Sequence, residues 1–554
     1  MIVLLASTLV TAVSSSTCDV ASLTDLLPTG SNATISYAVS VPANGTFGGG
    51  SADLEFPRND TGLPALCAVA VNVPSSENTS YNFGLFLPDV SNWNQRFIAS
   101  GNGGFGGGIN WNDMGTNVHY GFASLSTDTG HISGSGDGTW ALNNPESRTD
   151  WGYRALHGSV VLGKSLVSAY YTQSISYSYY SGCSTGGRQG LKEVEMFPED
   201  FDGVIAGAPA WWTTHLQTWT NKIGLWNLPV DSPTHIPTSL FPAIGAEVLR
   251  QCDPQDGLTD GIISDPYGCD FVPEVLLCGT PTAPNASTCL SAPQISTLYK
   301  IYNDYIETND TFVFPHLLLG SESQWSVIVG TDLTGTPSTL GYEFVQDFLY
   351  DDPNWSFYNF SYQTVLDADA ANPGMANADN FNLASFQSRG GKLLMYHGMA
   401  DGLIATGSSV YFYKEVLKTL YSTTALNGSS ALPISDFYRF YLIPGMQHCA
   451  GSPAGVDAPW YIAGANQPFS LGSSVYSVPG FEDPKHDALL ALMQWTEKGI
   501  APDDIIATKY VNDSINAGVQ KQRPLCPWPK QARFTGNGSV DSAESWVCEG
   551  GPLF

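Results

Sequence analysis

Alternating apolar and polar positions mark the first part of the chain as strand-forming. Residues 35–41, 68–73 and 82–87 alternate in this way and are rich in β-branched and aromatic side chains. A period of two places one set of side chains on a buried face, so these segments predict β-strands. Further strands are expected at 96–100 and 120–126.

Helical patterns then begin to alternate with strands. The composition of residues 150–169 predicts a helix, and Pro198 ends a second helical segment that begins at Arg188. The same rhythm continues in further expected strands and a final helix, at 175–180, 204–205, 392–396, 437–442 and 488–497. Strands that alternate with helices imply an α/β fold with a mainly parallel sheet, because parallel neighbours need a crossover connection.

The rhythm fades between residues 211 and 384. Trp, Asp, Asn, Pro and Thr become frequent there, and two short cysteine loops appear. We therefore expect one α/β domain, built from residues 17–210 and 385–554, and a large inserted lid domain at 211–384.

The N-terminal pattern and the acceptor sites for glycans indicate a secreted, extracellular protein. An apolar run followed by small residues predicts a signal peptide over residues 1–16, although a buried N-terminal strand is the alternative because no Lys or Arg precedes the run. Eleven Asn-x-Ser/Thr acceptors suit a glycosylated surface. They are Asn32, Asn44, Asn59, Asn78, Asn285, Asn309, Asn354, Asn359, Asn427, Asn512 and Asn537.

Charge excludes two classes of partner. The chain has 51 acidic and 22 basic residues and a formal net charge of −29. Nucleic acid and anionic membranes would both be repelled, so neither is an expected partner. Beyond the N-terminal run, no apolar stretch has the length of a membrane span.

The string Gly182-Cys-Ser-Thr-Gly186 has the form of a nucleophile elbow with Ser184 at its tip. An expected strand precedes it and an expected helix follows it, which is the context that such a turn requires. Glycines on both sides tolerate a strained backbone and leave the serine hydroxyl exposed. Ser184 is therefore the candidate nucleophile of a serine hydrolase.

Two later loops supply the other members of a catalytic triad. Asp401 follows a glycine turn at the end of an expected strand, and His448 lies on a loop that Gly445 opens. The chain order Ser184, Asp401, His448 is that of the α/β-hydrolase fold, and the inserted lid explains the long first interval. In these roles His448 is the base for Ser184, and Asp401 orients the imidazole.

The glycine-rich run at residues 101–108 follows an expected strand. It lacks the Lys and Ser/Thr of a phosphate loop and has no clean dinucleotide fingerprint, so no organic cofactor is expected. In a hydrolase such a loop supplies a backbone N–H to an oxyanion hole. The expected donors are Thr185 and either Gly103 or Gly104, with a plain flexible turn as the alternative.

Ten cysteines, an even number, fit an oxidising compartment. Spacing suggests four local pairs, and Cys183 and Cys449 are left beside Ser184 and His448. If the serine and the histidine meet, these two cysteines come close enough to bridge. The expected pairs are Cys18–Cys67, Cys252–Cys269, Cys278–Cys289, Cys526–Cys548 and Cys183–Cys449.

The expected lid contains an acidic loop, Asp253-Pro-Gln-Asp256-Gly-Leu-Thr-Asp260-Gly-Ile262. Three carboxylates at short spacing, with carbonyls of Leu258 and Ile262, can wrap a hard cation such as calcium. A solvated acidic turn is the alternative. Zinc is not expected, because the chain has no Cys-x-x-Cys or His-Glu-x-x-His string.

Taken together, four strings resemble the tannase and feruloyl esterase family of secreted enzymes. They are Gly182–Gly187, His397–Asp401, Gly445–Cys449 and the acidic loop 253–263. The resemblance covers nearly the whole expected mature chain. It implies an α/β-hydrolase domain with a lid, the triad Ser184, Asp401 and His448, a bridge from Cys183 to Cys449, and structural calcium at the acidic loop.

The resemblance also implies aromatic ester substrates, either feruloyl and other hydroxycinnamoyl esters of plant cell walls or galloyl esters of tannins. Trp211, Trp212 and Trp219 are candidates to stack on the aromatic ring, with lid packing as the alternative. The absence of a Lys-Arg pair in the lid favours a feruloyl esterase over a tannase. A non-catalytic secreted binding glycoprotein, a peptidase and a lipase are the rival hypotheses.

Overall fold

The computed structural model describes residues 16–281, 287–421, 433–472 and 475–550. The signal peptide expected at 1–16 lies outside these residues, except for Ser16, and so do the acceptors Asn285 and Asn427. Within the described residues, no helix combines the length and the apolar composition that a membrane crossing requires.

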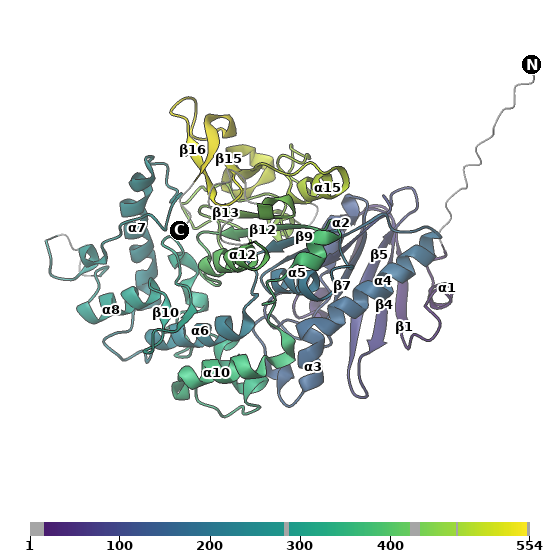
Figure 1. Ribbon diagram of the computed structural model, residues 1–554, viewed down its shortest axis with the longest axis horizontal. Helices are drawn as coiled ribbons and strands as arrows, with labels where there is room; N and C mark the ends of the chain where they lie inside the picture. Colours follow the sequence, from purple (N-terminus) through teal and green to yellow (C-terminus); the bar gives the residue numbers. More distant parts are fainter. Residues whose placement is uncertain (1–15, 282–286, 422–432, 473–474, 551–554) are drawn as a thin grey trace, which may run out of the picture.

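A nine-stranded sheet forms the centre of the described structure, in the order β1-β4-β5-β7-β6-β8-β9-β12-β13 (Figure 1). Three strands at one edge are antiparallel to their neighbours: β1 (Thr34–Val41), β4 (Leu66–Pro74) and β5 (Ser80–Pro88). The other six are parallel: β6 (Arg96–Ser100), β7 (Ala123–Thr127), β8 (Tyr177–Cys183), β9 (Gly203–Gly207), β12 (Lys392–Gly398) and β13 (Tyr438–Ile443).

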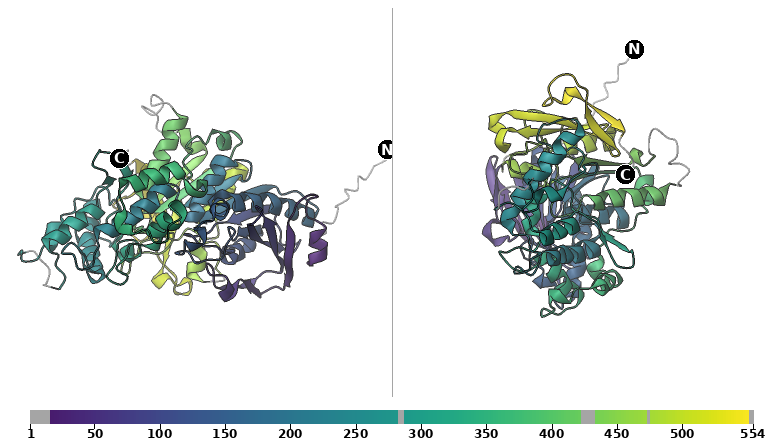
Figure 2. Two further views of the ribbon diagram at one scale, coloured as in Figure 1. Left: turned by 90° about the horizontal axis from the view of Figure 1, so that it is seen from below. Right: turned by 90° about the vertical axis from the view of Figure 1, so that its left-hand side faces the viewer.

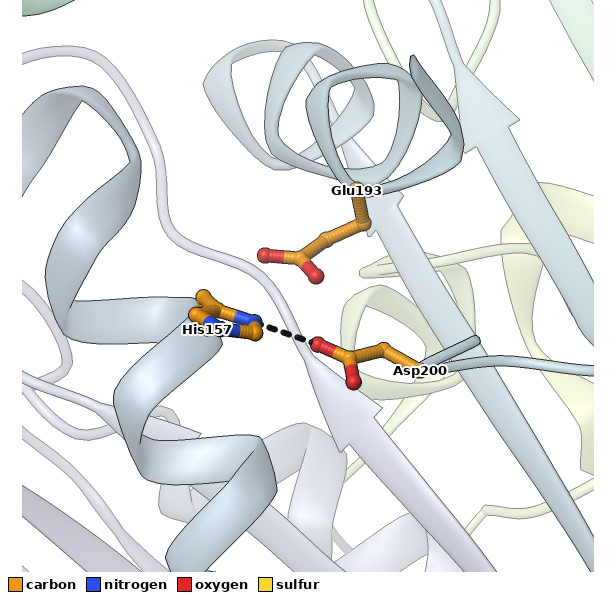
Figure 3. Close-up of side chains that lie close together, drawn as sticks. All are labelled: His157, Glu193 and Asp200. Carbon is orange, nitrogen blue, oxygen red and sulfur yellow. Dashed lines mark hydrogen bonds and ion pairs between the residues drawn. The ribbon is translucent and has the colours of Figure 1, made fainter. Parts of the chain in front are cut away.

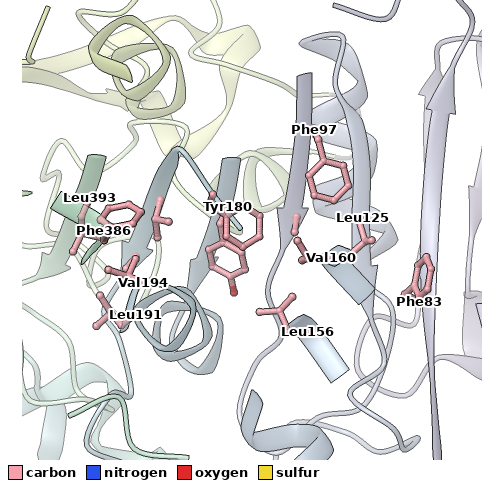
Figure 4. Packing of buried hydrophobic residues seen from close by; sticks show 14 of the residues in the cluster. Phe83, Phe97, Leu125, Leu156, Val160, Tyr180, Leu191, Val194, Phe386 and Leu393 are labelled. Atoms are coloured by element: carbon pink, nitrogen blue, oxygen red, sulfur yellow. The ribbon is translucent and has the colours of Figure 1, made fainter. Parts of the chain in front are cut away.

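Alternate residues of the central strands enter different hydrophobic clusters. In β9, Val204 and Ala206 pack on one face of the sheet and Ile205 on the other; Leu393 and Leu394 of β12 divide in the same way. Successive side chains of a strand point to opposite faces, so this division follows from the strand geometry itself. Figure 4 shows part of the first cluster, where strand side chains meet those of the covering helices.

Helices cover both faces of the sheet. One face packs against α4 (Ala155–Tyr171), α5 (Thr185–Met196) and α12 (Gly407–Leu420), and the other against α2 (Trp111–His119) and α15 (Ala488–Lys498). Apolar strands that are buried on both faces are typical of parallel sheets, because the connecting helices cover both faces. The architecture is the α/β-hydrolase fold, as predicted.

The chain between β9 and β12 contributes a second body of helices, which we call the lid. Its elements include α6 (Thr213–Trp226), α7 (Phe241–Cys252), α8 (Ala292–Ile301), α10 (Tyr362–Ala371) and the short pair β10 (Tyr305–Ile306) and β11 (Phe312–Phe314). They surround a hydrophobic cluster of their own. The lid lies at the opposite end of the molecule from β1 (Figures 1 and 2). The domain boundaries expected at 210/211 and 384/385 stay a prediction.

The remaining elements are short. They are the helices α1 (Val20–Thr24), α3 (Pro145–Thr149), α9 (Thr339–Glu343), α11 (Ala384–Ser388) and α14 (Gln467–Leu471), and the antiparallel pairs β2 (Gly45–Gly48) with β3 (Asn59–Leu63), β14 (Ile505–Tyr510) with β15 (Val519–Leu525), and β16 (Lys530–Phe534) with β17 (Trp546–Gly550). The C-terminal segment joins the body beside β13, where Trp528 N–H donates to the Phe440 carbonyl at 2.7 Å.

All ten cysteines are paired, in the combinations that the spacing suggests. Four disulfides join cysteines 11 to 49 positions apart, whereas the fifth joins residues 266 positions apart. They are Cys18–Cys67, Cys252–Cys269, Cys278–Cys289, Cys526–Cys548 and the long-range Cys183–Cys449.

Candidate active site

Ser184 lies between the end of β8 and the first turn of α5. Its backbone has φ 64° and ψ −124°, a conformation that a residue with a side chain rarely adopts. Close packing permits the turn only with glycine beside it, since a Cβ on Gly182 would lie 2.6 Å from the Gly186 carbonyl carbon. The strained turn is the nucleophile elbow predicted from the sequence, and it leaves Ser184 partly exposed.

Asp401 and His448 meet at the carboxyl ends of neighbouring parallel strands, β12 and β13. His448 Nδ1 lies 2.7 Å from Asp401 Oδ2. The Asp401 side chain is fully buried, and that of His448 is 13% exposed. Because Nδ1 is engaged with the carboxylate, Nε2 is the ring nitrogen left to act as a base.

A second histidine contacts the same carboxylate. His397 Nε2 lies 3.1 Å from Asp401 Oδ2, and the N–H groups of Leu403 and Ile404 donate to Oδ1 at 2.8 and 2.9 Å. Burial alone would raise the pKa of Asp401. The charge of His448 and the hydrogen bonds from both histidines outweigh burial and hold that pKa well below its ordinary value. His397 therefore stabilises the charged form of Asp401 as well.

One cavity of about 610 Å³ is lined by both the candidate nucleophile and the candidate base. Ser184, His448, Gly103 and Gly104 all line it, and the lid forms the opposite wall. The Cys183–Cys449 disulfide supports this arrangement, because it ties the residue before Ser184 to the residue after His448 with Cα atoms 5.9 Å apart.

The glycine loop lies beside the helix that begins after Ser184. Thr185 Oγ1 donates to the Gly104 carbonyl at 2.9 Å, which holds the loop against the start of α5. Gly103 N–H donates to Glu55 Oε1 at 2.5 Å, so this group is not free to bind an oxyanion. Of the two glycines expected from the sequence, Gly104 is therefore the better donor, together with the N–H of Thr185.

Glu55 was not foreseen in the sequence. Its carboxyl group accepts from Gly103 N–H and from Asn102 Nδ2, at 2.5 and 3.2 Å. Burial raises its pKa well above the ordinary value despite these hydrogen bonds. Glu55 belongs to an irregular N-terminal segment with no motif around it, and only the fold brings it under the glycine loop.

Comparisons with known proteins show the family to which the chain belongs. Residues 67–549 match the family described as "Tannase and feruloyl esterase". The "Probable feruloyl esterase B-1" of Neosartorya fischeri is 34% identical over 525 residues, which cover 95% of this chain and 92% of that protein. The chain belongs to the tannase and feruloyl esterase family. It is a carboxylic ester hydrolase.

Solved structures of this family show the same fold. Feruloyl esterase B from Aspergillus oryzae has a TM-score of 0.84 at 34% identity, over 96% of this chain and 99% of that one. The tannin acyl hydrolase from Aspergillus niger has a TM-score of 0.71 at 22% identity, over 96% of each chain. At that lower identity the likeness concerns the fold alone.

The three tryptophans that were expected to stack on the aromatic ring of a substrate lie outside the Ser184 cavity. Trp211 and Trp219 are buried; Trp211 Nε1 donates to the Ser408 carbonyl, and Trp219 packs against Phe314 in the lid core. Trp212 stacks on the His215 ring at 3.7 Å. None of the three lines the Ser184 cavity. The stacking hypothesis was therefore wrong, because these rings pack against other side chains and do not line the cavity.

The cavity wall combines aliphatic and hydroxyl-bearing side chains from the lid. Aliphatic and hydroxyl-bearing residues both come from one stretch of chain that the sequence did not single out. They are Ser326, Val327, Val329, Thr331, Thr334, Thr336, Pro337, Ser338, Thr339 and Leu340. Such a wall offers an apolar surface together with hydrogen-bonding groups for a phenolic ring.

The acidic loop folds back on its own carboxylates. Asp253, Asp256 and Asp260 each accept backbone N–H groups from the loop, including those of Leu258 and Ile262. Burial raises the pKa of Asp256, and the neighbouring charge of Asp260 acts in the same direction. The donors are all oxygen atoms, which fits calcium rather than a softer metal, and a cation would relieve the repulsion between the carboxylates.

One other group of side chains has the spacing of metal ligands. Among the described residues, His157, Glu193 and Asp200 bring one ligand atom each within 4.8 Å of one another (Figure 3). His157 Nδ1 lies 2.7 Å from Asp200 Oδ2, and its ring stacks on Phe197. Burial raises the pKa of Glu193 well above its ordinary value. The cluster thus combines a histidine–aspartate hydrogen bond with a buried carboxyl group whose charged form burial disfavours.

His131 supports the glycine loop from outside the cavity. Its Nε2 lies 2.9 Å from the Phe105 carbonyl, and its ring stacks on Trp140. Burial lowers the pKa of His131 to about 4, so the ring is neutral at ordinary pH. His131 does not line the cavity.

Proposed function

We propose that the protein is a secreted serine esterase that cleaves feruloyl and related hydroxycinnamoyl esters. The proposed triad is Ser184, His448 and Asp401. The observation that carries the proposal is that Ser184 and His448 line one cavity, while His448 Nδ1 lies 2.7 Å from Asp401. The strained elbow and the disulfide between Cys183 and Cys449 support it further.

The proposed reaction proceeds through an acyl-enzyme. His448 Nε2 takes the hydroxyl proton as Ser184 Oγ attacks the ester carbonyl carbon. The resulting oxyanion accepts hydrogen bonds from Thr185 N–H and Gly104 N–H, and His448 then protonates the departing alcohol. Water repeats the sequence on the acyl group and releases the carboxylic acid. Asp401 remains ionised throughout, which its depressed pKa favours.

The substrate class rests on the relatives and on the cavity wall. Relatives at 34% identity are called feruloyl esterases, whereas the tannin acyl hydrolase is 22% identical. Aliphatic and hydroxyl groups on the lid wall suit a substituted phenol attached to an unsaturated acyl chain. An esterified plant polysaccharide or a small aromatic ester is the proposed substrate, and a galloyl ester is the alternative.

Secretion and a structural calcium ion are part of the proposal. Five disulfides and an acidic surface suit an oxidising extracellular medium. The nine glycan acceptors within the described residues are all exposed. Asp253, Asp256 and Asp260, with the carbonyl groups of Leu258 and Ile262, would hold calcium, which would rigidify the lid.

The test compares methyl ferulate with methyl gallate. We expect acid release from ferulate to be faster, and Ser184→Ala to lose at least about 10⁴-fold in kcat. Ser296→Ala, on the exposed surface of lid helix α8, is the matched control and should retain wild-type rates. Equal rates for wild type and Ser184→Ala would overturn the triad. A faster gallate reaction would make the enzyme a tannase.

A further inference from the structure

A short 3-10 helix of the lid, Glu322–Val327, reaches the two loops that carry Asp401 and His448. Its base is firmly held in the lid. Trp325 is fully buried, packs against Phe241 and Tyr302, and donates its Nε1–H to Ser321 Oγ at 3.0 Å. A side chain of this helix therefore has a fixed origin in the lid core.

Gln324 is the side chain that spans the junction. Its Oε1 accepts two backbone N–H groups, from Gly402 at 3.1 Å and from His448 at 3.0 Å. An amide oxygen has two lone pairs, so one atom satisfies both donors. Gly402 directly follows Asp401. A single lid oxygen thus connects the backbones of the acid loop and the base loop.

The acid loop packs so closely against the lid that only glycine fits at position 402. A Cβ on Gly402 would lie 2.7 Å from the Ser321 carbonyl oxygen and 2.7 Å from Gln324 Cβ. Gln447, beside the base, donates its Nε2–H to Ser323 Oγ at 2.8 Å. Lid and catalytic loops are therefore joined from both sides at this point.

We propose that Gln324 is a positioning residue that aligns His448 with Asp401. The inference rests on the proposed esterase function. Asp401 and His448 belong to loops after different strands. The Ala400 N–H donates to the Met446 carbonyl at 2.8 Å and joins these loops, but neither this bond nor the Asp401–His448 hydrogen bond holds the backbone N–H groups of Gly402 and His448. The Gln324 carbonyl oxygen holds the two N–H groups at a common point and thereby keeps Nδ1 facing the carboxylate. The lid acts on catalysis through this oxygen.

Two variants separate positioning from general stability. Gln324→Leu removes the acceptor, and we expect kcat for methyl ferulate to fall about 10- to 100-fold with KM nearly unchanged. Gln324→Glu keeps an acceptor of the same length and should restore most of kcat at high pH. Its charge beside His448 favours the imidazolium, so the acid limb of kcat/KM should move to higher pH.

Gln363→Leu, the same change on an exposed lid position, is the matched control and should behave as wild type. Melting temperatures are measured for all variants, and assays are run below them. A Gln324→Leu variant with wild-type kcat and pH profile would overturn the inference. So would equal losses in the Leu and Glu variants with no shift in the pH profile.

A second readout does not depend on turnover. The proton between His448 Nδ1 and Asp401 gives a low-field NMR resonance, which should broaden or disappear in Gln324→Leu and persist in Gln324→Glu. An unchanged resonance in Gln324→Leu would contradict the positioning role. If the wild-type protein hydrolyses neither ester, the proposed function fails, whereas the resonance still tests Gln324.

Discussion

Cys183 and Cys449 form a disulfide that spans 266 residues and links the position before Ser184 to the position after His448. The covalent link restrains the separation of the loops that carry Ser184 and His448, on which the proposed proton transfer depends. Stability also benefits, because closing so long a loop restricts the unfolded chain. Its effects on catalysis and on stability can be measured separately.

We expect the double variant Cys183→Ala/Cys449→Ala to lose about 10- to 100-fold in kcat while it is still folded, since small displacements between nucleophile and base are costly. Activity and circular dichroism are followed together against temperature. Cys278→Ala/Cys289→Ala removes a short disulfide of the lid and serves as control, with kcat unchanged. Simultaneous loss of activity and structure in the first variant would refute the prediction.

Glu55 should control the position of the glycine loop. Glu55→Ala removes the acceptor of Gly103 N–H, so we expect kcat to fall about 10- to 100-fold, because oxyanion donors need accurate placement. Glu55→Gln keeps an oxygen acceptor for Gly103 N–H and should stay within about threefold of wild type. Initial rates with methyl ferulate test both variants. Glu77→Ala, at an exposed carboxylate, is the control, and wild-type kcat in Glu55→Ala would exclude the role.

Stability should decrease as the pH rises from about 4 to about 7. Burial is the main cause that raises the pKa of Asp60 to about 7, and those of Asp113, Asp128 and Asp487 to about 6, from an ordinary 3.8. These groups bind protons more tightly in the folded than in the unfolded chain. Their contribution is complete below pH 3.8 and is lost as the pH passes the folded-state values.

Asp60→Asn tests the group whose pKa is raised most among these four aspartates. The neutral amide cannot ionise, so the free energy of unfolding should change less between pH 4 and pH 8 than in wild type, by at most about 4 kcal/mol. Urea titrations at several pH values provide the measurement. A wild-type pH dependence in Asp60→Asn would show that Asp60 does not contribute.

Calcium removal should lower the melting temperature if the acidic loop binds the ion. We expect a chelator to destabilise the wild-type protein and added calcium to restore it, by about 3–4 kcal/mol at 100- to 1,000-fold excess over Kd. Asp256→Asn should weaken that response, whereas Asp310→Asn, on an exposed turn of the lid, should keep it. A response that Asp256→Asn leaves intact would locate the ion elsewhere.

Local patterns predicted much of the fold. The strands expected at 35–41 and 68–73 are β1 and β4, and the helix expected at 488–497 is α15. The single helix expected at 150–169 is instead a π-helical turn at 150–154 followed by α4. The C-terminal antiparallel pairs were not foreseen; β14 is mostly buried, whereas β16 and β17 are only partly buried.

By itself, the sequence determined the order of the strands along the chain, the elbow at Ser184, the candidate acid and base, and the cysteine pairs. The elbow and the four shorter cysteine pairs depend on residues close in the chain. Ten cysteines allow many pairings, so the Cys183–Cys449 bridge was a hypothesis that rested on the expected meeting of Ser184 and His448. Only the tertiary structure decided three contacts. The lid tryptophans pack inward, Gly103 N–H donates to Glu55, and Gln324 joins the loops of Asp401 and His448. These contacts join segments far apart in sequence, where no local periodicity or motif specifies the partner.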